Sequence, residues 1–154
     1  SAAVTLAFTV DEEHTFLGVQ HLVAAGVRAD CAIVAEPTQL NVVVAHKGVA
    51  RWQLHTAGVA GHSSRPDRGV NAVYRMARLV RGVEEYAAKL SASRADPLLG
   101  PPTVSVGTIH GGVSANVVPD GCRIEVDRRL LPGEDATAAA ADLTAFLTAY
   151  PGVD

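Results

Sequence analysis

CRIEVDRRL, residues 122–130, is the stretch that decides the fold, because its side chains alternate strictly between apolar and polar along most of its length. Cys122, Ile124 and Val126 fall on one face, and the residues between them, all charged, fall on the other. A period of two is typical of a β-strand with one buried and one hydrated face. The stretch therefore predicts a strand of an antiparallel sheet with one face open to water.

Two further segments carry strand patterns that fit the same sheet. Residues 41–56 form a long strand-like run that is broken at Lys47-Gly48, and its second half alternates in the same way. Residues 103–109 form a third strand. The side chains that we expect to face inward from these two segments are Ala50, Trp52, Leu54, Val104 and Val106.

Two amphipathic helices are predicted beside this sheet, one from about Val70 to Leu90 and one that follows Pro132-Gly133 and ends near Pro151. The order strand, helix, strand, strand, helix predicts an α+β fold, a ferredoxin-like β-α-β-β-α sandwich whose last strand is lacking. The expected apolar stripes are Val73, Ala77, Val80, Val83, Ala87 and Leu90 in the first helix, and Ala139, Leu143, Phe146, Leu147 and Tyr150 in the second.

A β-α-β unit is predicted ahead of this domain. Val4–Val10 and Cys31–Ala35 have the short apolar pattern of buried strands, and Phe16–Ala25 has the pattern of a helix that stops at Gly26. Such a unit is typical of a parallel sheet, so we expect a piece of an α/β domain. We divide the chain into residues 1–40 and residues 41–154.

The composition narrows the class of protein. With 48% hydrophobic and 19% charged residues, a net charge of −3 and no basic stripe, the chain has the character of a soluble globular protein with no nucleic-acid partner. Its apolar runs are far shorter than the roughly 20 residues of a membrane span, and its start lacks a signal-peptide pattern. Cys31 and Cys122 each lie in an apolar run without C-x-x-C spacing, which predicts two buried free thiols in a reducing cytoplasm.

Acidic residues follow both predicted strands of the first segment. Asp11-Glu12-Glu13 closes one strand and Glu36 closes the other. The carboxyl ends of neighbouring parallel strands meet, and adjacent side chains point to opposite sides, so one carboxylate could bind a metal while its neighbour acts on water. Alternatively, the acids are ordinary turn residues, or Asp11-Glu12-Glu13 begins the following helix near its positive end.

Two loops and one strand carry further candidate residues. His62 and Asn116 lie in loops of small residues, where a histidine can donate to a developing oxyanion and the backbone can approach a ligand. Arg129 lies on the hydrated strand face and suits a substrate carboxylate. The alternatives are an exposed loop histidine and a hydrated face with weak ion pairs, and we accept the latter for Arg123 and Glu125.

Six short motifs, taken together, resemble one known family. In chain order they are TxDEE, EPT, HKG, GHSSxPxxGxNA, GGxxxNVVP and DxRxxPGE, and they run from Thr9 to Glu134. This order resembles the zinc-dependent amidohydrolase family of acetylornithine deacetylase, succinyl-diaminopimelate desuccinylase, aminoacylase and carboxypeptidase G. The resemblance covers nearly the whole chain.

The resemblance implies a catalytic domain with two zinc ions, in which cobalt or manganese could replace zinc, and an inserted lid domain that dimerises. Glu12 matches the general base, and Glu13 and Glu36 match ligands of the two zinc ions. Two glutamates are too few for two zinc ions, since each takes about four ligands. The resemblance places the remaining ligands outside residues 1–154, so we expect the chain alone to lack zinc and activity.

For the lid, the resemblance assigns His62 to the oxyanion in the partner subunit's active site, and Asn116 and Arg129 to the substrate. It implies a cytoplasmic homodimer that cleaves the amide bond of an N-acyl amino acid or small peptide. Residues 103–109 are the strand that we expect to pair across the dimer axis. The alternative function is a stand-alone ferredoxin-like dimerisation or small-molecule-binding module without catalysis.

Overall fold

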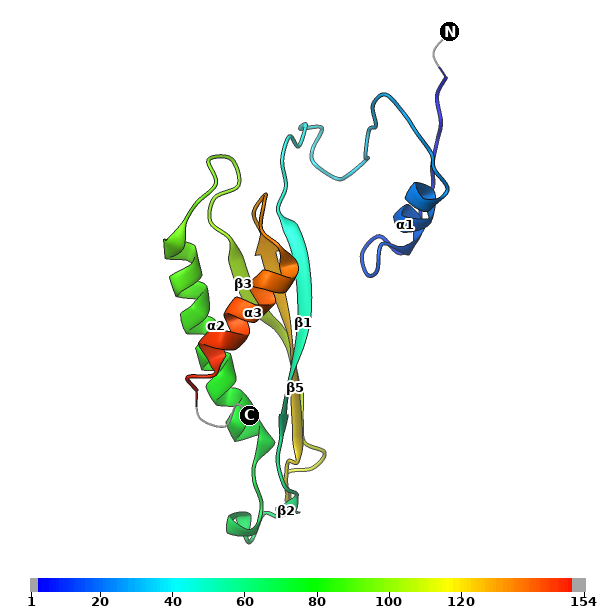
Figure 1. The fold of residues 1–154 in the computed structure, drawn as a ribbon. Helices are drawn as coiled ribbons and strands as arrows, with labels where there is room; N and C mark the ends of the chain where they lie inside the picture. The colour runs from blue at the N-terminus through cyan, green and yellow to red at the C-terminus, as the bar shows by residue number, and fades with distance from the viewer. Residues whose placement is uncertain (1–2, 151–154) are drawn as a thin grey trace. The chain divides into compact units, whose positions relative to one another are not determined.

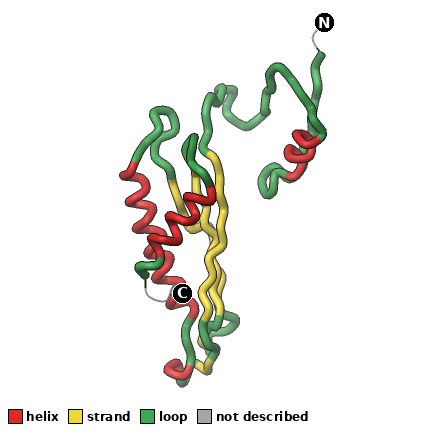
Figure 2. Tube along the Cα trace, viewed as in Figure 1, coloured by secondary structure: helices red, strands yellow, loops and turns green. Residues whose placement is uncertain are grey.

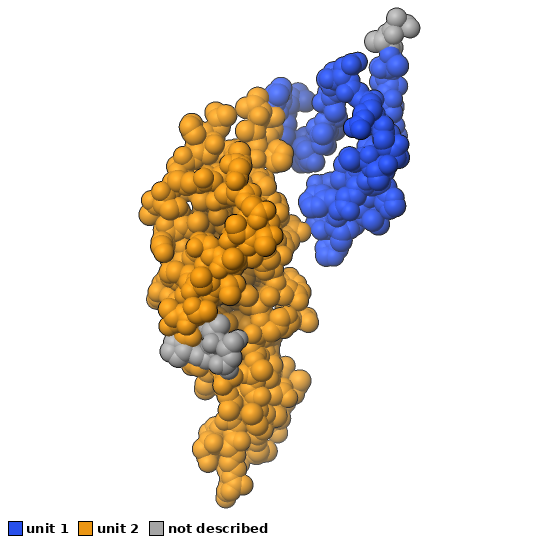
Figure 3. Space-filling view, viewed as in Figure 1, with its two compact units in different colours: residues 1–42 blue, residues 43–154 orange. Residues whose placement is uncertain are grey.

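The computed structural model describes residues 3–150 and divides into two compact units, residues 1–42 and residues 43–154, shown in different colours in Figure 3. The second unit carries the sheet and its two helices.

Three antiparallel strands form the sheet of the second unit, in the order β1 (Gly48–Ala57), β5 (Gly121–Leu130) and β3 (Thr103–Gly111). The central strand β5 alternates as predicted, because its inward residues Ile124 and Val126 are no more than 1% exposed. The predicted antiparallel sheet with one hydrated face is confirmed.

Helices α2 (Ala72–Ser93) and α3 (Ala136–Leu147) cover one face of this sheet (Figure 1). Both start at a side-chain cap: Asn71 accepts a hydrogen bond from the Tyr74 amide, and Asp135 accepts one from the Ala138 amide. The order β1, α2, β3, β5, α3 confirms the α+β sandwich that the sequence predicts.

The stripe predicted for α2 is confirmed in part: Val83 and Leu90 are buried, but other positions of the buried face differ from the prediction. Met76, Leu79 and Tyr86 enter the core, whereas Ala77 is exposed and Ala87 is only partly buried. The larger side chains bury more apolar area, and burial energy scales with area, so they take the inward positions. The stripe predicted for α3 is confirmed, with Leu143 and Leu147 in the core and Phe146 packed against it.

Two short strands were not predicted. β2 (Gly61–His62) pairs with β4 (Val117–Val118), so loops that are far apart in the sequence lie side by side. A short 3-10 helix, Pro66–Arg68, follows β2. Strands of two residues leave no periodic pattern in a sequence, which is why pattern analysis misses them.

The described part of the first unit, residues 3–42, contains one helix, α1 (Leu17–Ala24), where the sequence predicts residues 16–25. Gly26 follows it with a positive φ of 74°. The strands predicted at Val4–Val10 and Cys31–Ala35 are not formed: both segments are loop in Figure 2. No described backbone hydrogen bond joins them, and a strand needs such a partner.

The apolar side chains of these two segments are exposed as a result, with Phe8 at 93% and Ile33 at 97%. Cys31 is exposed as well, so its predicted burial is wrong, whereas Cys122 is buried; both thiols are free. None of the helices in residues 3–150 has the length and apolar character needed to cross a membrane.

Candidate functional site

The pairing of β2 with β4 brings His62 and Asn116 together. His62 lies opposite Val117 in this pairing, and the Ser63 amide donates a 3.0 Å hydrogen bond to the Asn116 carbonyl. His62 is the last residue of β2 and Asn116 lies in the turn before β4. Both are exposed, at the end of the sheet where β1 finishes and β5 starts, which we call the distal end (Ala57 and Gly121).

Ser64 fixes the proton of the His62 ring. Its backbone amide donates to Nδ1 of His62 at 3.2 Å, and its hydroxyl lies 2.8 Å from the same nitrogen. An amide N–H can only donate, so Nδ1 is an acceptor and the neutral ring carries its proton on Nε2. Nε2–H is the donor that His62 can offer to an oxyanion.

Asn116 is oriented in a similar way. The Ser114 hydroxyl donates to its side-chain carbonyl at 2.5 Å, which leaves the side-chain amide as a donor. A hollow of about 440 Å³ lies beside it, lined by residues 111–115 and by Val73, Val117 and Pro119 among others. Gly111 must be small here, since a Cβ would lie 2.8 Å from the sulfur of Cys122. The small-residue loop that precedes Asn116 thus lines a space that a ligand can enter, whereas the loop of His62 does not line it.

Arg129 lies at the opposite end of the sheet, the proximal end (Gly48 and Leu130). It pairs with Val49 on one side and Thr103 on the other. Its side chain lies on the hydrated face, where Nε donates to Asp127 at 2.6 Å. Because strands rise about 3.3 Å per residue, the eight residues from Gly121 to Arg129 separate the two ends by about 25 Å.

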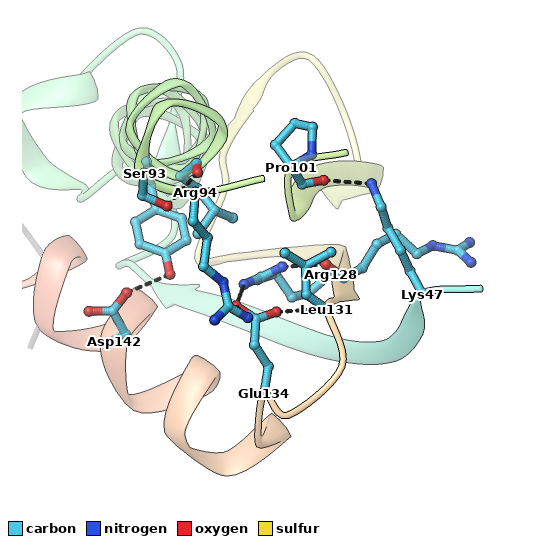
Figure 4. A network of polar contacts seen from close by, with 11 residues as sticks. Lys47, Ser93, Arg94, Pro101, Arg128, Leu131, Glu134 and Asp142 are labelled. Carbon is cyan, nitrogen blue, oxygen red and sulfur yellow. Dashed lines mark hydrogen bonds and ion pairs between the residues drawn. The ribbon is translucent and has the colours of Figure 1, made fainter. Parts of the chain in front are cut away.

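A buried ion pair at the proximal end was not predicted (Figure 4). Arg128 is 2% exposed on the inner face of β5, and its Nη2 donates to Glu134 at 3.0 Å while Nη1 donates to the Arg129 carbonyl. Glu134 also accepts from the Leu131 amide at 2.7 Å and lies 3.5 Å from Arg94. The signal in the sequence is a charged residue at an inward position of an alternating strand.

The acids of the first unit lie in turns. Glu12 and Glu13 are exposed in a turn that two hydrogen bonds close. The Phe16 amide donates to the Asp11 carbonyl, and the Thr15 hydroxyl donates to the Asp11 carboxylate. Helix α1 begins only at Leu17 and has no acid in its first turn, so the helix-start interpretation is wrong. Glu36 is exposed, and its backbone carbonyl accepts a hydrogen bond from the Thr38 amide in the turn that follows.

The described residues 3–150 contain no group of three or more His, Cys, Asp or Glu side chains placed to hold a metal ion. A zinc site takes about four ligands, so Glu13 and Glu36 do not fit a complete zinc site by themselves. We derive no chemical step through a metal from these residues.

Comparisons with known proteins identify the family of this chain. A family model described as a peptidase dimerisation domain matches residues 44–153. Acetylornithine deacetylase of Myxococcus xanthus is 40% identical over 86% of this chain, and that of Pectobacterium carotovorum is 38% identical over 81%. The chain spans 36% and 33% of these relatives, about a third of their length.

Solved structures show the same fold. An aminobenzoyl-glutamate utilization protein from Klebsiella pneumoniae superposes with a TM-score of 0.52 at 21% identity, over 68% of this chain and 25% of that one. A hydantoinase/carbamoylase-family amidase from Burkholderia phymatum gives 0.53 at 17% identity, over 66% and 24%.

Proposed function

The chain belongs to the peptidase dimerisation domain family, and we propose that it is the lid domain (residues 43–154), with part of the catalytic domain, of a homodimeric amidohydrolase. The reaction is hydrolysis of the amide bond in an N-acyl amino acid or small peptide. The juxtaposition of His62 and Asn116 carries this proposal, because the pairing of β2 with β4 brings these two side-chain donors together from distant parts of the sequence. The loop that precedes Asn116 lines a hollow that a ligand can enter.

The separation of the two ends of the sheet supports a dimer. A small substrate cannot bridge the roughly 25 Å between His62 and Arg129 of one lid. If both act on one substrate, they come from different copies of the chain. Each active site then takes Arg129 from one subunit and His62 with Asn116 from the partner.

The proposed roles follow from the side chains. Glu12 takes a proton from the attacking water and returns it to the leaving amine. The Nε2–H of His62 stabilises the oxyanion of the tetrahedral intermediate. Asn116 donates its amide to the substrate, and Arg129 binds the substrate carboxylate as a planar fork.

Zinc belongs to this proposal through the family resemblance. Glu13 and Glu36 would supply two of the ligands, and the rest would come from segments outside residues 1–154. We therefore propose that the isolated chain neither retains zinc on dialysis nor turns over, and metal analysis of the dialysed chain measures this. Stoichiometric zinc or cleavage of an N-acetyl amino acid by the isolated chain would contradict it.

N-Acetylornithine is the first substrate to test, because the relatives at about 40% identity are named acetylornithine deacetylases. A match over 86% of the chain reaches into residues 1–42, which a stand-alone lid module would not need. The unpaired thiols of Cys31 and Cys122 support a reducing compartment, and we place the enzyme in the cytoplasm.

The β3 edge supports dimerisation. β3 pairs only with β5 among the described strands, and its other edge adjoins no strand. Ile109 on β3 is 54% exposed and Tyr74 on α2 is 68% exposed, which leaves apolar surface on adjoining elements. Strand pairing across a twofold axis would bury both.

The test uses the full-length enzyme and measures amine release from N-acetylornithine and other N-acetyl amino acids. We expect cleavage that a chelator abolishes and that added zinc restores. Absence of cleavage for every N-acyl amino acid, or full activity after chelation, would overturn the proposal.

A further inference from the structure

The hydrated face of the sheet holds a second arginine next to Arg129. Arg51 on β1 lies directly opposite Asp127 on β5, and Arg129 lies two residues further along the same face. Nε of Arg51 donates to Oδ2 of Asp127 at 3.3 Å, while Nε of Arg129 donates to Oδ1 at 2.6 Å. One carboxylate therefore holds two guanidinium groups, each by its Nε.

The terminal nitrogens of both arginines are left over. Among residues 3–150, neither side chain has a further polar partner, and both are about half exposed, at 50% and 46%. An arginine that spends only Nε on its partner still has four terminal N–H groups, and these match a carboxylate bidentately.

The charges do not balance either. Two positive groups share one negative group, which leaves the Arg51, Asp127 and Arg129 cluster with a net charge of +1. Glu125 is the next acid along this face, and its carboxylate accepts a 3.1 Å hydrogen bond from the side-chain amide of Gln53. A second anion would relieve the repulsion between the guanidinium groups.

Stability alone does not account for this cluster. Exposed ion pairs contribute about 0–1 kcal/mol, and two like charges beside one another reduce that gain. Arg123 on the same face has no described ion pair, so this sheet does not require its arginines to be paired.

We propose that Arg51 is a second residue that binds the substrate carboxylate together with Arg129, and that Asp127 is the positioning residue that aims both guanidinium groups. This inference rests on the proposed function, which assigns only Arg129 to the carboxylate. The ligand is the free carboxylate of the N-acyl amino acid.

The experiment compares an N-acetyl amino acid with its carboxamide analogue on the full-length enzyme. Discrimination is kcat/KM for the acid divided by kcat/KM for the carboxamide. Arg51→Gln is expected to lower it about tenfold, the effect of losing a charge-assisted hydrogen bond, through KM and with kcat within about twofold. Arg129→Gln is expected to lower it at least as much, and Arg123→Gln is the matched control that leaves it unchanged.

Asp127→Asn is expected to lower discrimination as well, because it releases both arginines, and Asp127→Glu is expected to restore part of it. A purely structural role for Asp127 would change thermal stability and leave discrimination intact. If Arg129→Gln lowers discrimination but Arg51→Gln does not, this inference is overturned and the proposed function stands. If Arg129→Gln has no effect, the carboxylate site of the proposed function fails.

Discussion

The two ends of the lid sheet differ in how their polar side chains are held. At the distal end, His62 and Asn116 are exposed, and a two-residue strand pair and single hydrogen bonds hold their segments together. At the proximal end, Arg129 lies above a buried ion pair between Arg128 and Glu134. The sheet thus separates two sets of polar groups by about 25 Å, too far for both to contact one small substrate in one copy.

The largest effect is expected at the distal end. His62→Ala in the full-length enzyme should lower kcat by roughly 10²–10³, because it removes an oxyanion donor. His55→Ala, an exposed histidine on β1, is the matched control and should leave kcat unchanged. A loss below threefold for His62→Ala would remove that role from the distal end.

Glu134→Ala tests the proximal end. It leaves the buried Arg128 without its carboxylate, so we expect a loss of about 3 kcal/mol in the free energy of unfolding. Urea unfolding measures this loss. Glu125→Ala on the exposed face should change the free energy by less than about 0.5 kcal/mol.

Replacing both partners sharpens the same comparison. The double variant Arg128→Met with Glu134→Leu should recover most of the lost stability, since apolar groups of similar size pack without a buried charge. A double variant as unstable as Glu134→Ala would show that the ion pair itself stabilises the proximal end.

Tyr86 tests how burial and a hydrogen bond in the core between the two ends stabilise the fold. Burial and the 2.7 Å hydrogen bond to Asp142 raise the pKa of Tyr86 to about 12. The folded state therefore keeps the phenolic proton at a pH where the unfolded chain releases it, so the contribution is complete below pH 10 and is lost between pH 10 and about 12.

Tyr86→Phe should cost about 1 kcal/mol at neutral pH and flatten the alkaline fall in stability. Urea unfolding at pH 9 and pH 11 measures both effects. Tyr74→Phe, on the exposed side of the same helix, is the control and should keep the wild-type pH dependence. An unchanged alkaline slope in Tyr86→Phe would contradict the assignment.

The smallest effect is expected for Ser64→Ala. It removes the hydroxyl beside Nδ1 of His62 but keeps the amide donor, so the ring proton stays on Nε2. We expect a decrease in kcat of about threefold, in line with one modest hydrogen bond. Ser64→Pro, which also removes the amide, should lower kcat further. Equal effects for the two variants would show that the amide does not set the tautomer.

How far the sequence predicts the fold depends on whether a segment has its packing partner. The alternation of β5 predicts its buried face, because β1, β3 and both helices lie within the same unit. Val4–Val10 has an equally clear apolar pattern and forms no strand, because no described segment pairs with it. An apolar pattern shows that a segment can form a buried strand, but the strand forms only where another segment packs against it.

The candidate site divides in the same way. The sequence names His62 and Asn116 but not their contact, since a two-residue strand pair has no periodicity. It also misses Arg128, because a buried arginine is stable only with Glu134, and pairings across a turn do not show in an alternating pattern.

Mixed dimers of the full-length enzyme test the central claim, that His62 of one copy acts in the active site of the partner copy. Glu12→Ala and His62→Ala, each inactive alone, are co-expressed or mixed and allowed to exchange subunits. If His62 serves the partner's site, each mixed dimer has one intact site, and random assortment should restore about a quarter of wild-type activity. No recovery, with exchange of subunits demonstrated, would show that His62 acts within its own copy and would contradict the account.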